Sequence, residues 1–184
     1  MIRTTIKSAI FISLLLVAFG VLAPTAYGAG IYFEPEPATY KVGDSFTLSL
    51  VLDTGGASIN AVDISILVPK LLKIKSISKN ESIIQLWVNE PSFSGQTINL
   101  TGGIPGGVTN SKGVIAKITF EAAAIGSGNI AFMSNSSVLL NDGQGTKLGL
   151  EMTGGPAFSI IPRPKESSAQ EPEPNKEDEQ TEDS

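Results

Sequence analysis

Apolar and polar residues alternate one by one along several short stretches of the chain. The clearest stretch covers residues 114–122, where Ile118 and Phe120 alternate with Lys117 and Thr119. A period of two places apolar side chains on one face of a β-strand and polar side chains on the other. We therefore expect a strand here with one buried face and one wet face.

The same pattern predicts about nine short strands and no helix of any length. The other expected strands cover residues 31–34, 45–53, 60–68, 72–77, 83–88, 97–101, 130–132 and 157–161. Glycine-rich segments at 102–107 and 126–128 are predicted to be a loop and a break between strands. Many short strands separated by glycine and proline turns are typical of a β-sandwich or barrel. The expected fold class is thus all-β.

Residues 1–28 have the pattern of a secretory signal peptide. Arg3 and Lys7 precede an apolar run over residues 9–22, and Ala26 and Gly28 are small residues at the −3 and −1 positions of a cut before Ala29. The alternative is an uncleaved anchor helix, although the run is shorter than a span needs. Either interpretation places the rest of the chain outside the cytoplasmic membrane, secreted or at the cell surface.

Residues 162–184 contain no large apolar side chain and carry 3 Lys+Arg against 8 Asp+Glu. Such a segment buries too little apolar surface to offset its chain entropy, so we expect a disordered, extended acidic tail or linker. The expected organisation is a signal peptide at 1–28, one β-domain at 29–161 and this tail.

Composition excludes several kinds of chemistry. The chain has neither Cys nor His, which rules out a Ser-His-Asp triad, a Cys-His pair and a His-ligated metal site. The β-domain carries 8 Lys against 10 Asp+Glu and shows no basic patch, so the charge pattern expected of nucleic-acid binding is missing. We predict no metal site and no cofactor on this chain.

Three further features each have a functional and a structural interpretation. Lysines at 70, 73, 75 and 79 could bind an anion, but charged residues also protect an edge strand against pairing. The only Trp, Trp87, could stack on a sugar or belong to the core or its rim. The segment 141–146 is oxygen-rich enough to suggest calcium, yet Asn-Asp-Gly is turn chemistry and the spacing is not that of an EF-hand loop.

Paired carboxylates could hydrolyse glycosides without any His. Nothing in the sequence pairs two of the available acids, and most of them lie at turns or on a wet strand face. The acids considered are Asp44, Asp53, Asp63, Glu90, Glu121 and Asp142. We therefore expect a protein that is not an enzyme.

Six short motifs follow one another along residues 31–150. They are Val42-Gly43-Asp44-Ser45-Phe46; Leu52-Asp53-Thr54 ahead of Ile59-Asn60-Ala61-Val62; Leu71-Leu72-Lys73-Ile74 after Pro69; Gly102-Gly103; Ile115-Ala116 and Ile118-Thr119-Phe120 after Gly113; and Asn141-Asp142-Gly143 with Gly145-Thr146. In this order and spacing they resemble the cohesin domain. The resemblance covers nearly all of the expected β-domain.

The resemblance implies a nine-stranded jelly-roll β-sandwich akin to some carbohydrate-binding modules. Cohesins are non-catalytic and bind dockerin modules, which carry the calcium, to assemble polysaccharide-degrading enzymes or attach proteins to the cell surface. The family's binding face is the sheet of its third, fifth, sixth and eighth strands. The outward residues that map onto that face are Asp63, Ser65, Gln85, Thr97, Asn99, Thr101, Ala131 and Met133.

Two hypotheses from different classes follow. The first is an extracellular cohesin-like module that binds a dockerin-bearing or other extracellular protein, with calcium on the partner and membrane contact only through an uncleaved leader. The alternative is a carbohydrate-binding module of related fold that binds polysaccharide, with Trp87, Tyr32 and Tyr40 as stacking residues. A sugar platform generally needs exposed aromatic faces, and a planar row of them is not readable in the sequence.

Overall fold

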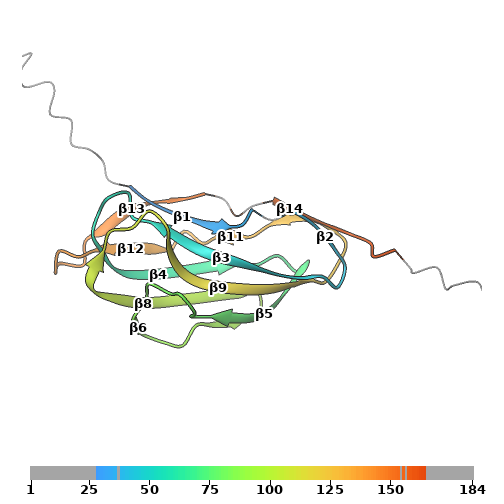
Figure 1. Cartoon of the computed structure of the whole chain (residues 1–184), viewed down its shortest axis with the longest axis horizontal. Helices are drawn as coiled ribbons and strands as arrows, with labels where there is room; N and C mark the ends of the chain where they lie inside the picture. Colours follow the sequence, from blue (N-terminus) through green and yellow to red (C-terminus); the bar gives the residue numbers. More distant parts are fainter. Residues whose placement is uncertain (1–27, 37, 154, 156, 165–184) are drawn as a thin grey trace, which may run out of the picture.

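The computed structural model describes residues 28–36, 38–153, 155 and 157–164, and these form strands joined by turns (Figure 1). The predicted leader, apart from Gly28, and the tail from residue 165 onward lie outside the described residues. Within the part of the chain that is described, no helix long and apolar enough to cross a membrane is found.

Fourteen strands are formed by the described residues. They are β1 (Gly28–Glu34), β2 (Thr39–Lys41), β3 (Ser45–Asp53), β4 (Ile59–Leu67), β5 (Leu72–Ser78), β6 (Leu86–Trp87), β7 (Ser92–Ser94), β8 (Thr97–Val108), β9 (Gly113–Ala122), β10 (Gly126–Asn129), β11 (Ala131–Phe132), β12 (Ser137–Leu140), β13 (Lys147–Met152) and β14 (Ala157–Ile161).

One large sheet contains most of these strands, in the order β5-β9-β3-β1-β13-β12-β4-β8-β6. Short strands β11 and β7 pair with β4 and β8, and a separate three-stranded sheet has the order β10-β14-β2. Most pairs are antiparallel, whereas β1 with β13 and β14 with β2 are parallel. The predicted all-β class and jelly-roll sandwich are confirmed, while the predicted strand count of about nine was too low because several segments are only two to four residues long.

The core lies between the two halves of the large sheet. Alternate residues of β3 and β9 on one side and of β4 and β8 on the other fall in a single cluster of buried apolar side chains. The predicted alternation explains this directly, because Leu50 and Phe120 are fully buried while their neighbours in sequence, Ser49 and Glu121, are not. Burial of this cluster is the main favourable contribution to folding.

The predicted loop at 102–107 is wrong, because β8 continues through it to Val108. Gly102 lies under the strand β6: a Cβ atom added there would collide with the Ile84 side chain and come within 2.9 Å of the Leu86 carbonyl oxygen. Glycine therefore marks a close approach of two backbones here rather than a turn. Gly106 and Gly107 have φ values of 81° and 74°, which only glycine adopts readily, where β8 turns at its end.

Three further expectations about strands need correction. The segment 83–88 forms only the two-residue strand β6, and the Ile83 backbone N–H donates instead to the Val114 carbonyl of β9. The segment 126–128, expected to be a break, forms β10 by pairing with β14. Strand β13 was missed, although Leu148, Leu150 and Met152 alternate there.

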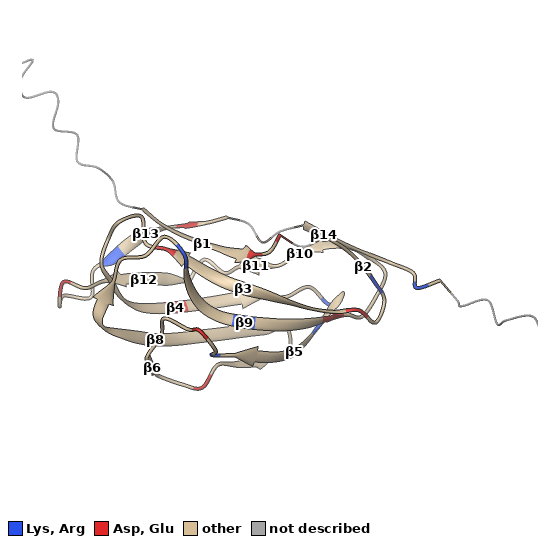
Figure 2. Cartoon of the chain, in the orientation of Figure 1, with Lys and Arg blue, Asp and Glu red and all other residues tan. Residues whose placement is uncertain are grey.

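Charged residues are interspersed over loops and strand edges, as Figure 2 shows. Of the four lysines at 70, 73, 75 and 79 that were considered as an anion site, two form ion pairs: Lys75 with Glu121 and Lys79 with Glu90. The side-chain hydrogen bond from Lys75 lowers the pKa of Glu121. These pairs fit the interpretation of a solvated sheet edge.

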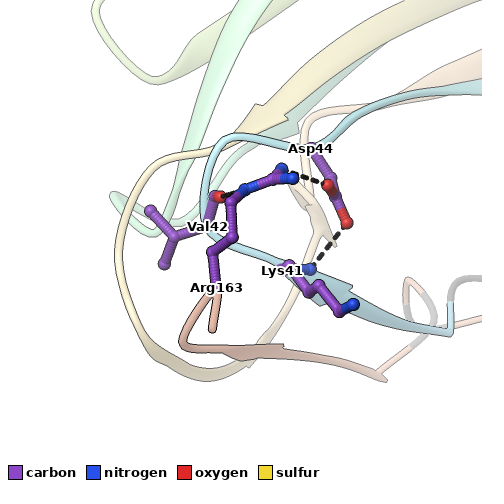
Figure 3. Close-up of polar contacts among 4 residues, drawn as sticks. All are labelled: Lys41, Val42, Asp44 and Arg163. Carbon is purple, nitrogen blue, oxygen red and sulfur yellow. Dashed lines mark hydrogen bonds and ion pairs between the residues drawn. The ribbon is translucent and has the colours of Figure 1, made fainter. Parts of the chain in front are cut away.

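Arg163 fastens the end of β14 to the turn between β2 and β3 (Figure 3). Its Nε donates to the Val42 carbonyl at 3.0 Å, and its Nη2 donates to Asp44 Oδ1 at 2.6 Å. The other carboxylate oxygen of Asp44 accepts the Lys41 backbone N–H at 2.7 Å. That backbone hydrogen bond is the largest cause of the lowered pKa of Asp44. Desolvation opposes it, and the nearby Arg163 charge adds a weaker lowering effect.

Candidate protein-binding face

The outer surface of the β4–β8 pair carries most of the residues predicted for partner binding. Asp63 pairs with Thr101, Ser65 with Asn99 and Leu67 with Thr97 in an antiparallel register. The intervening residues of both strands, such as Ile64 and Leu100, are buried in the core. The alternate residues from 61 to 67 and from 97 to 103 therefore point outward, and we call this surface the β4–β8 face.

Met133 and Ala131 extend this face on the side of β4. Ala131 pairs with Leu67, and the Met133 backbone N–H donates to the Ser65 carbonyl at 2.9 Å. Gln85 lies on the opposite side, where its backbone N–H donates to the Gly103 carbonyl of β8 at 3.2 Å. The structure thus brings all eight predicted residues to one surface or its edge.

Asp63 is the one charged residue among those predicted for this face. Its Oδ1 accepts a hydrogen bond from Thr101 Oγ1 at 2.9 Å, across the strand pair. The carboxylate is exposed, so its remaining lone pairs are open to solvent or to a partner. Asp63 and Thr101 together offer oxygen atoms held in a fixed position on a rigid pair of strands.

Ser65 differs from the expectation that it presents its hydroxyl to a partner, because it is only 6% exposed. The turn at 133–136 lies over it: Ser136 Oγ accepts the Ser65 backbone N–H at 3.1 Å and donates to the Ser65 carbonyl at 3.2 Å. The Ser65 hydroxyl is bonded to Asn99 and Asn135. The exposed polar groups above Ser65 are therefore these two amides.

Large apolar side chains are exposed around the polar centre of the face. Of the seven exposed ones among the described residues, four lie on the face or at its edge, and three lie elsewhere. Leu86 is 62% exposed and Val88 69%, and both lie along the β6 side. The four are Leu67, Leu86, Val88 and Met133; the other three are Ile125, Ile161 and Phe93, which pairs with inward-facing Ile98.

Leu86 and Trp87 of β6 lie on opposite sides of the sheet. Leu86 pairs with outward-facing Gly103, and Trp87 pairs with inward-facing Gly102. Trp87 is consequently half-buried and packs against the core. Leu86 and Val88 were missed as face residues, because nothing in the local pattern of 83–88 shows which of its sides faces outward.

The aromatic residues considered for sugar stacking lie apart from one another. Tyr40 stacks on Phe46 with ring centroids 3.8 Å apart, and Tyr32 lies in β1 opposite Val51 of the neighbouring strand β3. Trp87 points toward the core. These three rings, all partly buried, form no planar row.

The six carboxylates considered for glycoside hydrolysis each bond to a group other than a second carboxylate. Asp44 and Glu121 pair with Arg163 and Lys75, and Glu90 pairs with Lys79. The remaining three accept hydrogen bonds: Asp53 from the Gly55 N–H, Asp63 from Thr101, and Asp142 from the Gln144 N–H.

The segment 141–146 forms a turn, as its Asn-Asp-Gly chemistry predicted. A side-chain hydrogen bond from Thr146, followed by the Gln144 backbone N–H, lowers the pKa of Asp142. Within the described residues, no group of three or more acidic, His or Cys side chains is placed to hold a metal ion.

Solved structures with similar folds decide the fold family. A non-cellulosomal cohesin from the hyperthermophilic archaeon Archaeoglobus fulgidus superposes with a TM-score of 0.60 at 14% identity, covering 73% of this chain and 91% of that one. The domain has the cohesin fold. The seventh ScaB type I cohesin from Pseudobacteroides cellulosolvens also gives 0.60, at 19% identity and with 76% and 96% of the two chains covered.

A third cohesin of this fold is part of a type I cohesin–dockerin complex from Clostridium thermocellum. It superposes with a TM-score of 0.58 at 15% identity, over 76% of this chain and 99% of that chain. No family model and no curated protein match the chain. The cohesin fold is therefore detected through the three-dimensional arrangement, and identities this low establish the fold alone.

Proposed function

We propose that the chain is an extracellular, non-catalytic module that binds a dockerin-type protein through its β4–β8 face. The observation that carries this proposal is the presence of four exposed apolar side chains around a polar centre on that face. Protein interfaces commonly combine apolar anchors with a hydrogen-bonding surround. The cohesin fold supports the same conclusion, because several neighbours of that fold are complexes with dockerins.

Calcium in this proposal belongs to the partner and not to this chain. The leader predicted at 1–28 supports secretion, and the acidic tail supports a role as a spacer. A link to polysaccharide breakdown would come through what the partner carries. The alternative, direct sugar binding, is not favoured by any feature of the face, since Trp87 packs against the core.

The test is capture from the source organism's lysate and secretome, with calcium and then with chelator. The chain from Gly28 to Ser184 is immobilised in three forms: wild type, Leu86→Asp and Ile125→Asp. Leu86 and Ile125 are 62% and 60% exposed, so the two variants carry the same charge at equally exposed positions. Only Leu86 lies on the β4–β8 face.

We expect wild type and Ile125→Asp to retain a protein that carries a dockerin and to release it in chelator, while Leu86→Asp fails to retain it. Equal retention by all three forms would place the contact on another surface. If no form retains a protein, the resemblance to cohesins concerns the fold only, and polysaccharide binding becomes the hypothesis to pursue.

A further inference from the structure

The hydroxyl of Ser65 is buried at the centre of the β4–β8 face and joins two exposed side chains. Its Oγ donates to Asn99 Oδ1 at 3.1 Å and accepts from Asn135 Nδ2 at 3.2 Å. The two asparagines lie far apart in sequence, on β8 and on the turn after β11. Ser65 is therefore a small bridge between the strand pair and the turn above it.

This bridge has a direction, because a hydroxyl group has one hydrogen to donate. The hydrogen of Ser65 goes to the oxygen of Asn99, which leaves the amide nitrogen of Asn99 free. The nitrogen of Asn135 is bonded to Ser65, which leaves its oxygen free. Both asparagines are exposed, and within the described residues neither free atom has another hydrogen bond.

We propose that Ser65 is a positioning residue that turns the two amides in fixed, opposite directions. The face then presents a donor on Asn99 next to an acceptor on Asn135. A peptide group, or the side-chain amide of Asn or Gln, carries one donor and one acceptor and matches this pair. A carboxylate has acceptors only and an ammonium group has donors only, so neither matches both atoms.

This proposal rests on the proposed function for the identity of the surface, and it adds the chemistry of the group recognised there. An exposed asparagine that is not held can rotate its amide and must be ordered when a partner binds. A buried hydroxyl that fixes both amides beforehand removes that ordering cost. Because Ser65 itself is covered by the turn at 133–136, it acts only through its two neighbours.

The first experiment measures the side-chain amides of the full chain by NMR. We expect the Asn135 amide hydrogens to show contacts to the Ser65 β-hydrogens and to exchange with water more slowly than those of Asn80, which lies in an exposed turn. In Ser65→Ala this slow exchange is lost, whereas Ser65→Thr, which keeps the hydroxyl, retains it. The proposal is overturned if the Asn99 hydrogens contact Ser65 instead, or if both amides already exchange freely in the wild type.

The second experiment tests the recognised group with small probes. N-methylacetamide, sodium acetate and methylammonium chloride are added separately at equal concentrations, and the side-chain amide signals of Asn99, Asn135 and Asn80 are followed. We expect N-methylacetamide to shift Asn99 and Asn135 more than Asn80, with loss of that difference in Ser65→Ala. Equal or larger shifts with acetate or methylammonium would overturn the match to an amide.

These measurements use the free protein and do not depend on any protein partner. A failed capture experiment with an intact amide pattern would reject the proposed function and leave the Ser65 bridge in place. Successful capture with freely rotating amides would reject only the bridge.

Discussion

Arg163 and Asp44 show how single residues fix the end of the domain. The depressed pKa of Asp44 arises from the Lys41 backbone N–H and from the guanidinium of Arg163. We predict that Arg163→Gln raises the pKa of Asp44 toward its model-compound value of 3.8. An NMR titration of the side-chain carboxyl groups measures this. Asp142, whose pKa is lowered by Thr146 and not by Arg163, serves as an internal control that should not move.

The pH dependence follows from the direction of that shift. A carboxyl group whose pKa is lower in the folded state than in the unfolded state stabilises the fold fully above the unfolded pKa. The contribution is lost as the pH falls through the folded pKa of Asp44, so the effect of Arg163→Gln on stability should vanish in strong acid. An unchanged titration of Asp44 in the variant would show that the hydrogen bond to Arg163 does not form in solution.

The residues of the face were predictable to different degrees. Asp63 and Asn99 followed from strict alternation within long strands, which sets the outward side without any tertiary information. The burial of Ser65 did not follow, because the turn at 133–136 that covers it arrives from about seventy residues further along the chain. No local pattern in the sequence around Ser65 predicts that contact.

The two-residue strand β6 depends on a close fit against its neighbour β8. It lies against β8 only because Gly102 has no side chain, so we expect Gly102→Ala to overpack this contact and to destabilise the fold by about 1–3 kcal/mol. Chemical denaturation measures the loss. Gly149→Ala is the matched control, since a methyl group there meets nothing within 4 Å.

A Gly102→Ala variant as stable as Gly149→Ala would contradict the close packing of β6 on β8.

The sequence alone could not assign β6, because two residues are too few to define a period. The bounds of β3, in contrast, were predicted correctly at residues 45–53, where an apolar residue stands at every second position from Phe46 to Leu52. A long strand can therefore be predicted from the local alternation of apolar and polar residues. The existence of a short strand depends on its pairing with a neighbouring strand.

At the scale of the whole molecule, β13 joins the two halves of the large sheet. It pairs in parallel with β1 on one side and antiparallel with β12 on the other. We predict that a chain ending at Thr146, which lacks β13 and β14, does not fold, whereas a chain ending at Pro164 keeps the native fold. Near-ultraviolet circular dichroism and the dispersion of NMR signals distinguish the two results.

A folded chain ending at Thr146 would mean that the two halves of the large sheet are held together by their shared core alone.

The sandwich class was predictable from the number and length of alternating segments. The role of β13 was not, because which strands become neighbours is decided by packing over the whole domain and by the curl of the sheet.

The pairing of Gly28 with Gly149 has a consequence for the order of events during synthesis. A chain that emerges amino-terminus first exposes β1 long before its parallel neighbour β13 has been made. Contacts between such distant segments slow folding. The intervening chain loses conformational entropy when it closes into a loop, and the stabilising contacts form only after that loss. We therefore expect the sandwich to close only after nearly the whole domain has been made.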